Sequence, residues 1–330
     1  MNTKNDKVKI LRKRKHYLLL ACCFLILNVS GQSTEVSKDD KAYVDYVYPQ
    51  LDSENSRWFY FASASRPFGM VNLSPDTELD GAWGSGYRYK VDTIKGFSHI
   101  HAWQLSGVSV LPVDLGKIDE KSVGKDYYSS FDHAKEKVSP GYHKLHLDRY
   151  DIDVELTSTK RVGFHRYHYN SDNGAILVNL SGPLGPSKIV EGSLAQIEPR
   201  VLEGELTNAP TRRRPKPTKV FFRIVLDRDV LTEDGKFLLK LEKGKGEVKM
   251  KVALSYTSLE NAKFNLDEEL PHWDFDKIVD ESRSEWNNLL GRIKVEGDSD
   301  KQKQRFYTDL WHALQGRRTI SDANGYYPDN

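Results

Sequence analysis

Cysteine is nearly absent from this chain. The 330 residues include two cysteines, Cys22 and Cys23, and both lie in the first thirty residues. If that segment is removed, the remaining protein has no thiol, no disulfide and no thiolate ligand for a metal. The sequence therefore excludes cysteine proteases, zinc ribbons and redox motifs, and the fold must rely on its core alone.

The short motifs of several large enzyme classes are missing as well. The chain has neither a P-loop nor a G-x-S-x-G elbow. The stretch GAWGSGYRY, Gly81–Tyr89, has the spacing G-x-x-G-x-G and lies among strand-like segments, so it is not a dinucleotide loop. No pair of carboxylates is singled out by its context. A net charge of +2 gives no indication of nucleic acid as a partner.

The first 31 residues differ from the rest. A basic stretch, KVKILRKRKHY, precedes the apolar run LLLACCFLIL and the small residues of NVSGQ. This order predicts a signal peptide over residues 1–31, cleaved before Gln32, and hence export to the periplasm or cell surface. Two alternatives stay open: an uncleaved anchor, although the apolar run is short for a membrane span, and a lipid anchor on Cys22 within LLAC.

Short strands dominate the next part of the chain, from Tyr43 to about Asp267. The segment HKLHLDRYDIDVELTSTKRVGFHRYHY alternates apolar and polar residues in three runs, with turns near Asp148 and Lys160. Further runs cover 175–180, 218–227 and 236–256, the last being a hairpin around KGKG, while 208–219 (NAPTRRRPKPTK) is a loop. Strands at this spacing favour a mainly β fold with an antiparallel β-sandwich over residues 42–272.

The pattern changes after Pro271. Apolar residues of 275–293 lie on one face of a helix, and 298–316 repeats this with a cap at Ser299 or Asp300 and a stop at Gly316. Residues 273–330 are therefore predicted to be a linker helix and the start of a helical domain. Two helices cannot close a bundle by themselves, so they must lean on the sandwich or belong to a truncated domain.

Two histidines stand one residue apart in GFSHIHAWQLSG, Gly96–Gly107. Because alternate residues of a strand point the same way, the imidazoles of His99 and His101 could meet one ligand. A zinc site would need a third ligand, and the other histidines nominate none. The pair is thus a half-site for a metal, a polar pair facing a ligand, or two structural histidines.

Aromatic and polar residues are dense around this pair. Sugars present apolar C–H faces and rings of hydroxyls, so their sites combine aromatic platforms with Asp, His and Arg side chains. The block Arg66–Trp103 has this mixture. The predicted substrate-binding residues are Arg66, Phe68, Asp76, Trp83, Tyr87, His99, His101 and Trp103.

Five motifs in this chain follow the order found in a known family. SRPFGMVNLSPDT (65–77), GYRYKVDTIKGFSHIH (86–101), SPGYHKLHL, DVELTSTKRVGFHRYHY (153–169) and FYTDLWHALQGRRTISDANGYY (306–327) resemble the α-mannosidases of glycoside hydrolase family 92. Two stretches depart from the family pattern, FSHIHAWQLSG and SRPFG, and both fall near the expected pocket.

The resemblance implies a β-sandwich packed on an (α/α)6 barrel and a calcium-dependent, inverting hydrolysis of terminal α-mannosidic bonds, with α-1,2 linkages expected. In the family the general acid, the general base and the calcium ligands lie in the barrel. No catalytic or metal residue is therefore carried over to this chain, which is expected to be a truncated and inactive piece whose sandwich supplies one wall of the mannose pocket. The alternatives are a non-catalytic sugar-binding sandwich and a His-x-His metalloenzyme; no protein partner is indicated.

Overall fold

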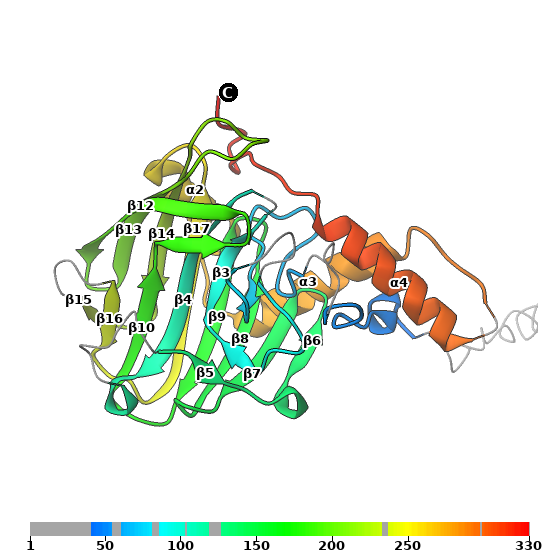
Figure 1. Cartoon of the computed structure of the whole chain (residues 1–330), viewed down its shortest axis with the longest axis horizontal. Coiled ribbons are helices and arrows are strands. Elements are labelled where there is room, and N and C mark those ends of the chain that lie inside the picture. Colours follow the sequence, from blue (N-terminus) through cyan, green and yellow to red (C-terminus); the bar gives the residue numbers. More distant parts are fainter. Residues whose placement is uncertain are drawn as a thin grey trace, which may run out of the picture. The chain divides into compact units, whose positions relative to one another are not determined.

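The computed structural model describes residues 41–54, 61–80, 86–102, 104–118, 127–232, 237–297 and 299–329. The expected signal peptide and lipid anchor, and the predicted site residues Trp83 and Trp103, lie outside the described residues. Ala42–Asn330 forms one unit in which the sheets and helices contact each other (Figure 1). No helix in the described part of the chain is both long and apolar enough to cross a membrane.

The larger sheet of this unit is antiparallel throughout. Its strands run in the order β11-β12-β13-β14-β17-β9-β8-β7-β6. Their bounds are β6 Lys137–Ser139, β7 Tyr142–Leu147, β8 Ile152–Ser158, β9 Val162–Tyr169, β11 Gly182–Leu184, β12 Ser187–Glu198, β13 Val201–Asn208, β14 Thr218–Leu226 and β17 Gly246–Ser255.

The second sheet is also antiparallel and has the order β1-β3-β4-β10-β16-β15. Its strands are β1 Ser74–Asp76, β3 Gly96–His101, β4 Ser106–Asp114, β10 Gly174–Asn179, β15 Val230–Thr232 and β16 Leu238–Leu241. A separate pair joins β2 Thr93–Ile94 to β5 Ser129–Ser130. The short 3-10 helices are η1 Tyr43–Tyr46, η2 Leu115–Lys117 and η4 His133–Lys135.

The two sheets face each other across a shared core. A Cβ placed on Gly107 of β4 would lie 2.6 Å from Leu206 Cδ2 of β13, and His99 of β3 bonds His165 of β9. Strands of the larger sheet alternate between buried and half-exposed residues, as the patterns of β7 and β14 show. By contrast β3 is buried at every position, so both of its faces are covered. The predicted mainly β, antiparallel sandwich is confirmed.

Three helices follow the last strand: α2 Leu259–Glu269, α3 Phe275–Leu290 and α4 Asp300–Gln315. The helices predicted over 275–293 and 298–316 are confirmed as α3 and α4, and Ser299 caps α4 by accepting from the backbone N–H of Gln302. The prediction of strands up to Asp267 was wrong for α2. That helix buries Ala262, Asn265 and Leu266, and such a narrow face leaves little apolar periodicity in the sequence.

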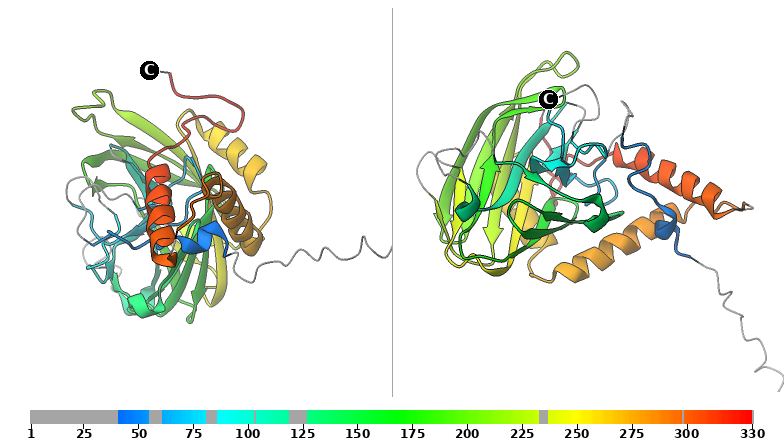
Figure 2. Two further views of the ribbon diagram at one scale, coloured as in Figure 1. Left: turned by 90° about the vertical axis from the view of Figure 1, so that its right-hand side faces the viewer. Right: turned by 60° about the horizontal axis from the view of Figure 1, so that its bottom comes forward.

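The helices lean on the sandwich. Trp286 of α3 is fully buried and donates from Nε1 to the carbonyl of Ser65 at 2.7 Å. The rings of Trp286 and Trp311 have centroids 6.2 Å apart, which joins α3 to α4. Segment η1 lies between these helices (Figure 2), and its Tyr46 stacks on Tyr307 of α4. The domain boundary predicted at residue 272 falls in the α2–α3 connection.

Candidate functional site

One end of the sandwich contains three of the predicted site residues, namely Phe68, His101 and the Asp76 carboxyl that pairs with His101. The β3–β4 turn (102–105) and the β13–β14 loop (209–217) meet there, because the backbone N–H of Ser106 donates to Asn208 Oδ1 at 3.0 Å. The β8–β9 turn (159–161) lies at the same end, since Val162 pairs with Ala253 near the last residue of β17. We call this end, with the segment 317–323 described next, the site end.

The segment that follows α4 crosses the site end (Figure 1). Arg318 Nη2 donates to the carbonyl of His101 at 3.3 Å, and the backbone N–H of Thr319 donates to the carbonyl of Phe68 at 2.9 Å. Arg161 Nε donates to the carbonyl of Ser321 at 2.7 Å. Three stretches of the sandwich are thus joined to residues that follow the helices.

Asp322 fixes this segment. Its side chain is buried, and it accepts hydrogen bonds from Ser255 Oγ at 2.9 Å, from Asn265 Nδ2 at 2.7 Å and from Thr257 Oγ1. The sequence analysis missed this residue, because its partners lie at the end of β17 and on α2, more than fifty positions away. No local pattern in the sequence signals such a contact.

Asp76 and His101, two of the predicted site residues, form a buried pair. Asp76 Oδ1 lies 2.7 Å from His101 Nε2, and Asp76 Oδ2 accepts from Ser98 Oγ at 2.5 Å. The other imidazole nitrogen of His101, Nδ1, lies 2.7 Å from the carbonyl of Asn72. Because the carbonyl of Asn72 can only accept, Nδ1 carries a proton, and Nε2 makes the second hydrogen bond of the ring, with the carboxyl group of Asp76.

Glycine is required beside this pair. Gly86 has φ +105°, and a Cβ there would lie 2.8 Å from His101 Cδ2. The backbone that leads into Tyr87 therefore passes directly over the imidazole. The backbone at Gly86 thus packs directly on the buried pair of Asp76 and His101. These are two of the predicted sugar-binding side chains.

His99 lies in the interior instead. Its Nδ1 is 2.5 Å from the carbonyl of Val108, and its Nε2 is 2.8 Å from His165 Nε2, whose Nδ1 is 2.8 Å from the hydroxyl of Tyr167. Only one arrangement of protons on neutral rings satisfies this row of hydrogen bonds: Tyr167 donates to His165, His165 donates to His99, and His99 donates to the carbonyl of Val108. Burial lowers the pKa of His99 to about 4, and it lowers the pKa of His165 well below its ordinary value.

Tyr87 is buried too, and it belongs to a network centred on Glu136. Glu136 Oε2 accepts from Tyr87 OH at 2.9 Å and lies 2.7 Å from His133 Nδ1, while Oε1 lies 2.8 Å from His143 Nε2. Burial by itself would raise the pKa of Glu136, but the hydrogen bonds with His143, His133 and Tyr87 lower this pKa to about 2. The network fixes the ring of Tyr87 within the protein.

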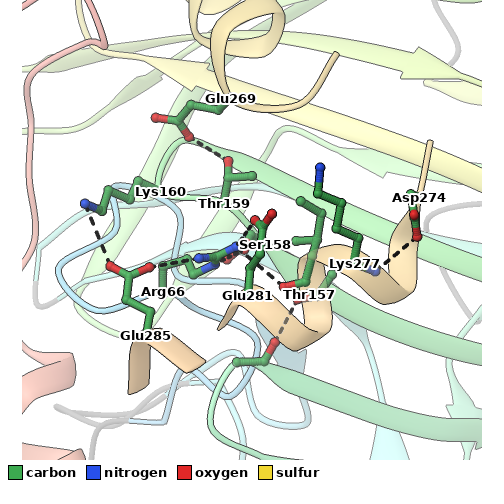
Figure 3. Close-up of polar contacts among 12 residues, drawn as sticks. Arg66, Thr157, Ser158, Thr159, Lys160, Glu269, Asp274, Lys277, Glu281 and Glu285 are labelled. Carbon is green, nitrogen blue, oxygen red and sulfur yellow. Dashed lines mark hydrogen bonds and ion pairs between the residues drawn. The ribbon is translucent and has the colours of Figure 1, made fainter. Parts of the chain in front are cut away.

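Arg66 points away from this region, toward α3 (Figure 3). Its Nη1 lies 2.8 Å from Glu285 Oε2, its Nη2 lies 3.0 Å from Glu281 Oε2, and its Nε donates to the carbonyl of Ser158 at 3.0 Å. Lys160 Nζ is 3.8 Å from the other oxygen of Glu285. In the structure this guanidinium links the sandwich to a helix.

Phe68 is the most accessible of the predicted residues that the structure describes. Its side chain is 42% exposed and its φ is +57°, a left-handed conformation that costs free energy for a bulky residue. The hydrogen bond from Thr319 holds its carbonyl in place. An exposed aromatic ring is the feature that stacking on the face of a sugar would require.

The zinc alternative finds no support in the described residues. Both ring nitrogens of His99 and of His101 have protein partners, so neither imidazole offers a lone pair to a metal. Within the ranges that the structure describes, no group of three or more His, Asp or Glu side chains is placed to hold a metal ion.

Comparison with known proteins identifies the family. The model of the glycosyl hydrolase family 92 N-terminal domain matches residues 46–263, and that of the family 92 catalytic domain matches residues 261–330. Together they cover most of the chain, from the strand-rich part into the helices. The chain belongs to glycosyl hydrolase family 92, as the motifs indicated.

Solved structures of this family share the fold. The family GH92 alpha-mannosidase BT3965 from Bacteroides thetaiotaomicron is 24% identical with a TM-score of 0.74; the match covers 88% of this chain and 43% of that one. The inverting mannosidase BT2199 from the same organism is 23% identical with a TM-score of 0.72, covering 88% of this chain and 42% of that one.

A curated relative was also found. An uncharacterized secreted glycosidase from Arthroderma benhamiae is 23% identical over 345 residues, which cover 90% of this chain and 44% of the relative. The chain thus spans less than half the length of the relatives it matches.

Proposed function

We propose that this chain is part of an exported α-mannosidase that removes terminal α-linked mannose, α-1,2-linked above all, from glycans. The observation that carries the proposal is the match to both family domains in sequence order. Two similar structures bear the name mannosidase, one of these proteins was solved with mannoimidazole, and the curated relative is called secreted. Together these names favour a mannose-containing glycan as the substrate and export of the protein from the cell.

The role proposed for the described residues is to bind the sugar, with Phe68 at the site end as the stacking platform. The carboxylates nearby are already engaged. Asp76 is paired with His101, Asp322 accepts three hydrogen bonds, and Glu269 is paired with Arg161. An inverting hydrolase needs a free acid and a free base about 6.5–9.5 Å apart, so that a water fits between them. We therefore infer that acid, base and calcium belong to the part of the catalytic domain outside the described residues.

The first test is to read the coding DNA beyond codon 330. An open frame that continues with helical sequence and paired acidic residues would supply the missing machinery. The protein so encoded should then release mannose from α-1,2-mannobiose, lose this activity in EGTA and regain it with calcium. Nuclear magnetic resonance should show β-mannose as the first product, because inversion changes the anomer, and the α-1,3- and α-1,6-linked isomers should react more slowly.

The isolated chain of 330 residues should bind α-mannobiose without releasing mannose. Mannose release by this chain would contradict our assignment of the acid and base to other residues. A stop directly after codon 330, with binding but no turnover, would instead support a sugar-binding module. A matched pair of variants, Phe68→Ala and Phe264→Ala on α2, both exposed phenylalanines, tests the platform: only the first should weaken binding.

A further inference from the structure

Glu136, to which the proposed function gives no role, is a buried carboxylate at the centre of a polar network. Only 1% of its side chain is exposed, and its two oxygens face Tyr87, His133 and His143. Tyr87 is 49 positions away in the sequence, whereas the two histidines are close neighbours in η4 and β7. The carboxylate therefore joins the stretch that follows β1 to a different part of the sandwich.

The network fastens the stretch 86–89 at two points. Glu136 Oε2 accepts from the hydroxyl of Tyr87 at 2.9 Å. His133 Nδ1 lies 2.7 Å from the same oxygen, and His133 Nε2 lies 2.7 Å from the carbonyl of Tyr89. The rings of His133 and Tyr89 also stack, with centroids 4.1 Å apart. Glu136 thus holds Tyr87 directly and Tyr89 through His133.

This stretch packs on a residue of the site end. The backbone N–H of Gly86 donates to the carbonyl of Glu78 at 3.0 Å, which pairs the stretch with residues that directly follow β1. The backbone of Gly86 also packs on the imidazole of His101, whose carbonyl accepts from Arg318. A displacement of the stretch would therefore displace His101 and the contact that it makes with the segment after α4.

The ring of Tyr87 contacts the helical side of the molecule. It stacks on the ring of Phe61, with centroids 4.3 Å apart, and Phe61 meets the ring of Trp311 on α4 edge to face at 6.4 Å. Tyr87 thus lies between the Glu136 network and residues that contact the first helix of the catalytic-domain match. Its orientation is fixed by a hydrogen bond to an ionised carboxylate, which is more directional than apolar packing.

We propose that Glu136 is a positioning residue for sugar binding, which acts through the hydroxyl of Tyr87 to fix the stretch 86–89 against His101. The inference rests on the proposed function, because it assumes that a mannose residue binds at the site end. Tyr87 was predicted to contact the sugar itself. Its hydroxyl is bonded to Glu136 and the residue is only 1% exposed, so it contributes by holding the backbone instead.

The test measures the affinity of variants for α-mannobiose by calorimetry. Tyr87→Phe removes only the hydroxyl and should weaken binding about fivefold, and Glu136→Leu should weaken it at least as much. Glu136→Gln should bind as the parent chain does. Its amide oxygen can still accept from Tyr87, and its NH2 group can face His143, whose other tautomer accepts. The double variant Tyr87→Phe/Glu136→Leu should bind no more weakly than Glu136→Leu, because the two residues act together.

The matched control is Tyr142→Phe, which removes a second hydrogen bond between a tyrosine and a glutamate of the sandwich. Tyr142 OH donates to Glu155 Oε2 at 2.5 Å. Tyr142→Phe and Tyr87→Phe should both lower the midpoint of thermal unfolding slightly, but only Tyr87→Phe should weaken binding. Equal affinity of Tyr87→Phe and the parent chain would overturn the inference and leave the proposed function intact. This variant decides the matter if Glu136→Leu does not fold.

Hydrogen exchange provides a readout without sugar. The backbone amide of Gly86 should exchange at least about fivefold faster in Tyr87→Phe and Glu136→Leu than in the parent chain, and at the parent rate in Tyr142→Phe. Unchanged exchange of Gly86 in Tyr87→Phe would overturn the inference. A parent chain that binds no α-mannobiose would contradict the proposed function, and the exchange of Gly86 would then decide by itself whether Glu136 holds this stretch.

Discussion

At the residue scale, burial keeps His99 neutral, although the sequence had marked this histidine as a candidate for ligand binding. His99 has its two nitrogens bonded to Val108 and His165, and a Cβ on Gly163 would lie 2.5 Å from its Cδ2. The ring is enclosed and neutral, since burial lowers the pKa of both imidazoles. His101, two residues later, instead has its Nε2 hydrogen-bonded to the buried carboxyl group of Asp76.

This contrast predicts how stability depends on pH. In the unfolded chain His99 and His165 bind protons near pH 6.5, but in the folded chain they resist protonation down to about pH 4 for His99. The unfolded state therefore binds more protons between these values, and stability must fall as pH drops below 6.5, by about 1.4 kcal/mol per pH unit for each histidine. Urea unfolding at pH 7.5 and at pH 5 measures this fall in the free energy of unfolding.

The variant His165→Gln keeps a donor for His99 and removes one titration. Its free energy of unfolding should be lower at pH 7.5, by about 1–3 kcal/mol, but should decline less between pH 7.5 and pH 5. His168→Gln, on an exposed residue of the same strand, should change neither quantity. An undiminished decline in His165→Gln would show that other groups cause the acid sensitivity.

At the element scale, Arg66 attaches α3 to the sandwich. It pairs with Glu281 and Glu285 on successive turns of the helix and bonds the last residue of β8, Ser158. The two carboxylates are 46% and 34% exposed, so solvent screens much of their attraction. The hydrogen bond from Arg66 Nε to the buried carbonyl of Ser158 is not screened in this way. If it is lost, the carbonyl of Ser158 is left as a buried acceptor without this donor.

We therefore expect Arg66→Met to lower the free energy of unfolding by about 1–3 kcal/mol, mostly through the carbonyl of Ser158. Glu281→Gln and Glu285→Gln should each have a smaller effect. Arg305→Met removes two exposed ion pairs, with Asp52 and Asp309, and should leave stability unchanged. Urea unfolding compares the four variants, and equal losses in Arg66→Met and Arg305→Met would contradict this account.

At the scale of the whole molecule, Asp322 connects the segment after α4 to the end of β17 and to α2. Its partners, Ser255, Thr257 and Asn265, come from the end of β17 and from α2. The segment that it anchors contacts Phe68 and His101, so the geometry of the site end depends on it.

The variant Asp322→Ala should release this segment without unfolding the sheets. Hydrogen exchange of the backbone amide of Thr319, which donates to Phe68, should become at least about tenfold faster, because bonds to a buried charge are lost. Amides of β17 should exchange as before. Asp267→Ala, which breaks an exposed pair with Lys263 on α2, is the control and should leave Thr319 protected.

The sequence predicted the parts of the fold whose signal is periodic. Alternation identified β7, β8 and β9, and the helical period identified α3 and α4. The strand β7 and the two helices each bury one face, whereas β9 is buried on both faces over its first four residues. The sequence did not reveal α2, which buries only a narrow face, and it did not identify β12 as a strand, because most residues of β12 are exposed. Neither element carries a strong pattern.

The sequence by itself also determined the family, because five ordered motifs are a property of the chain alone. The tertiary structure decided what each motif residue does. It placed Arg66 against α3, joined His101 to Asp76, enclosed His99 and left Phe68 exposed. These outcomes depend on partners far away in the sequence and on burial, and both arise only when the two sheets and the helices pack together.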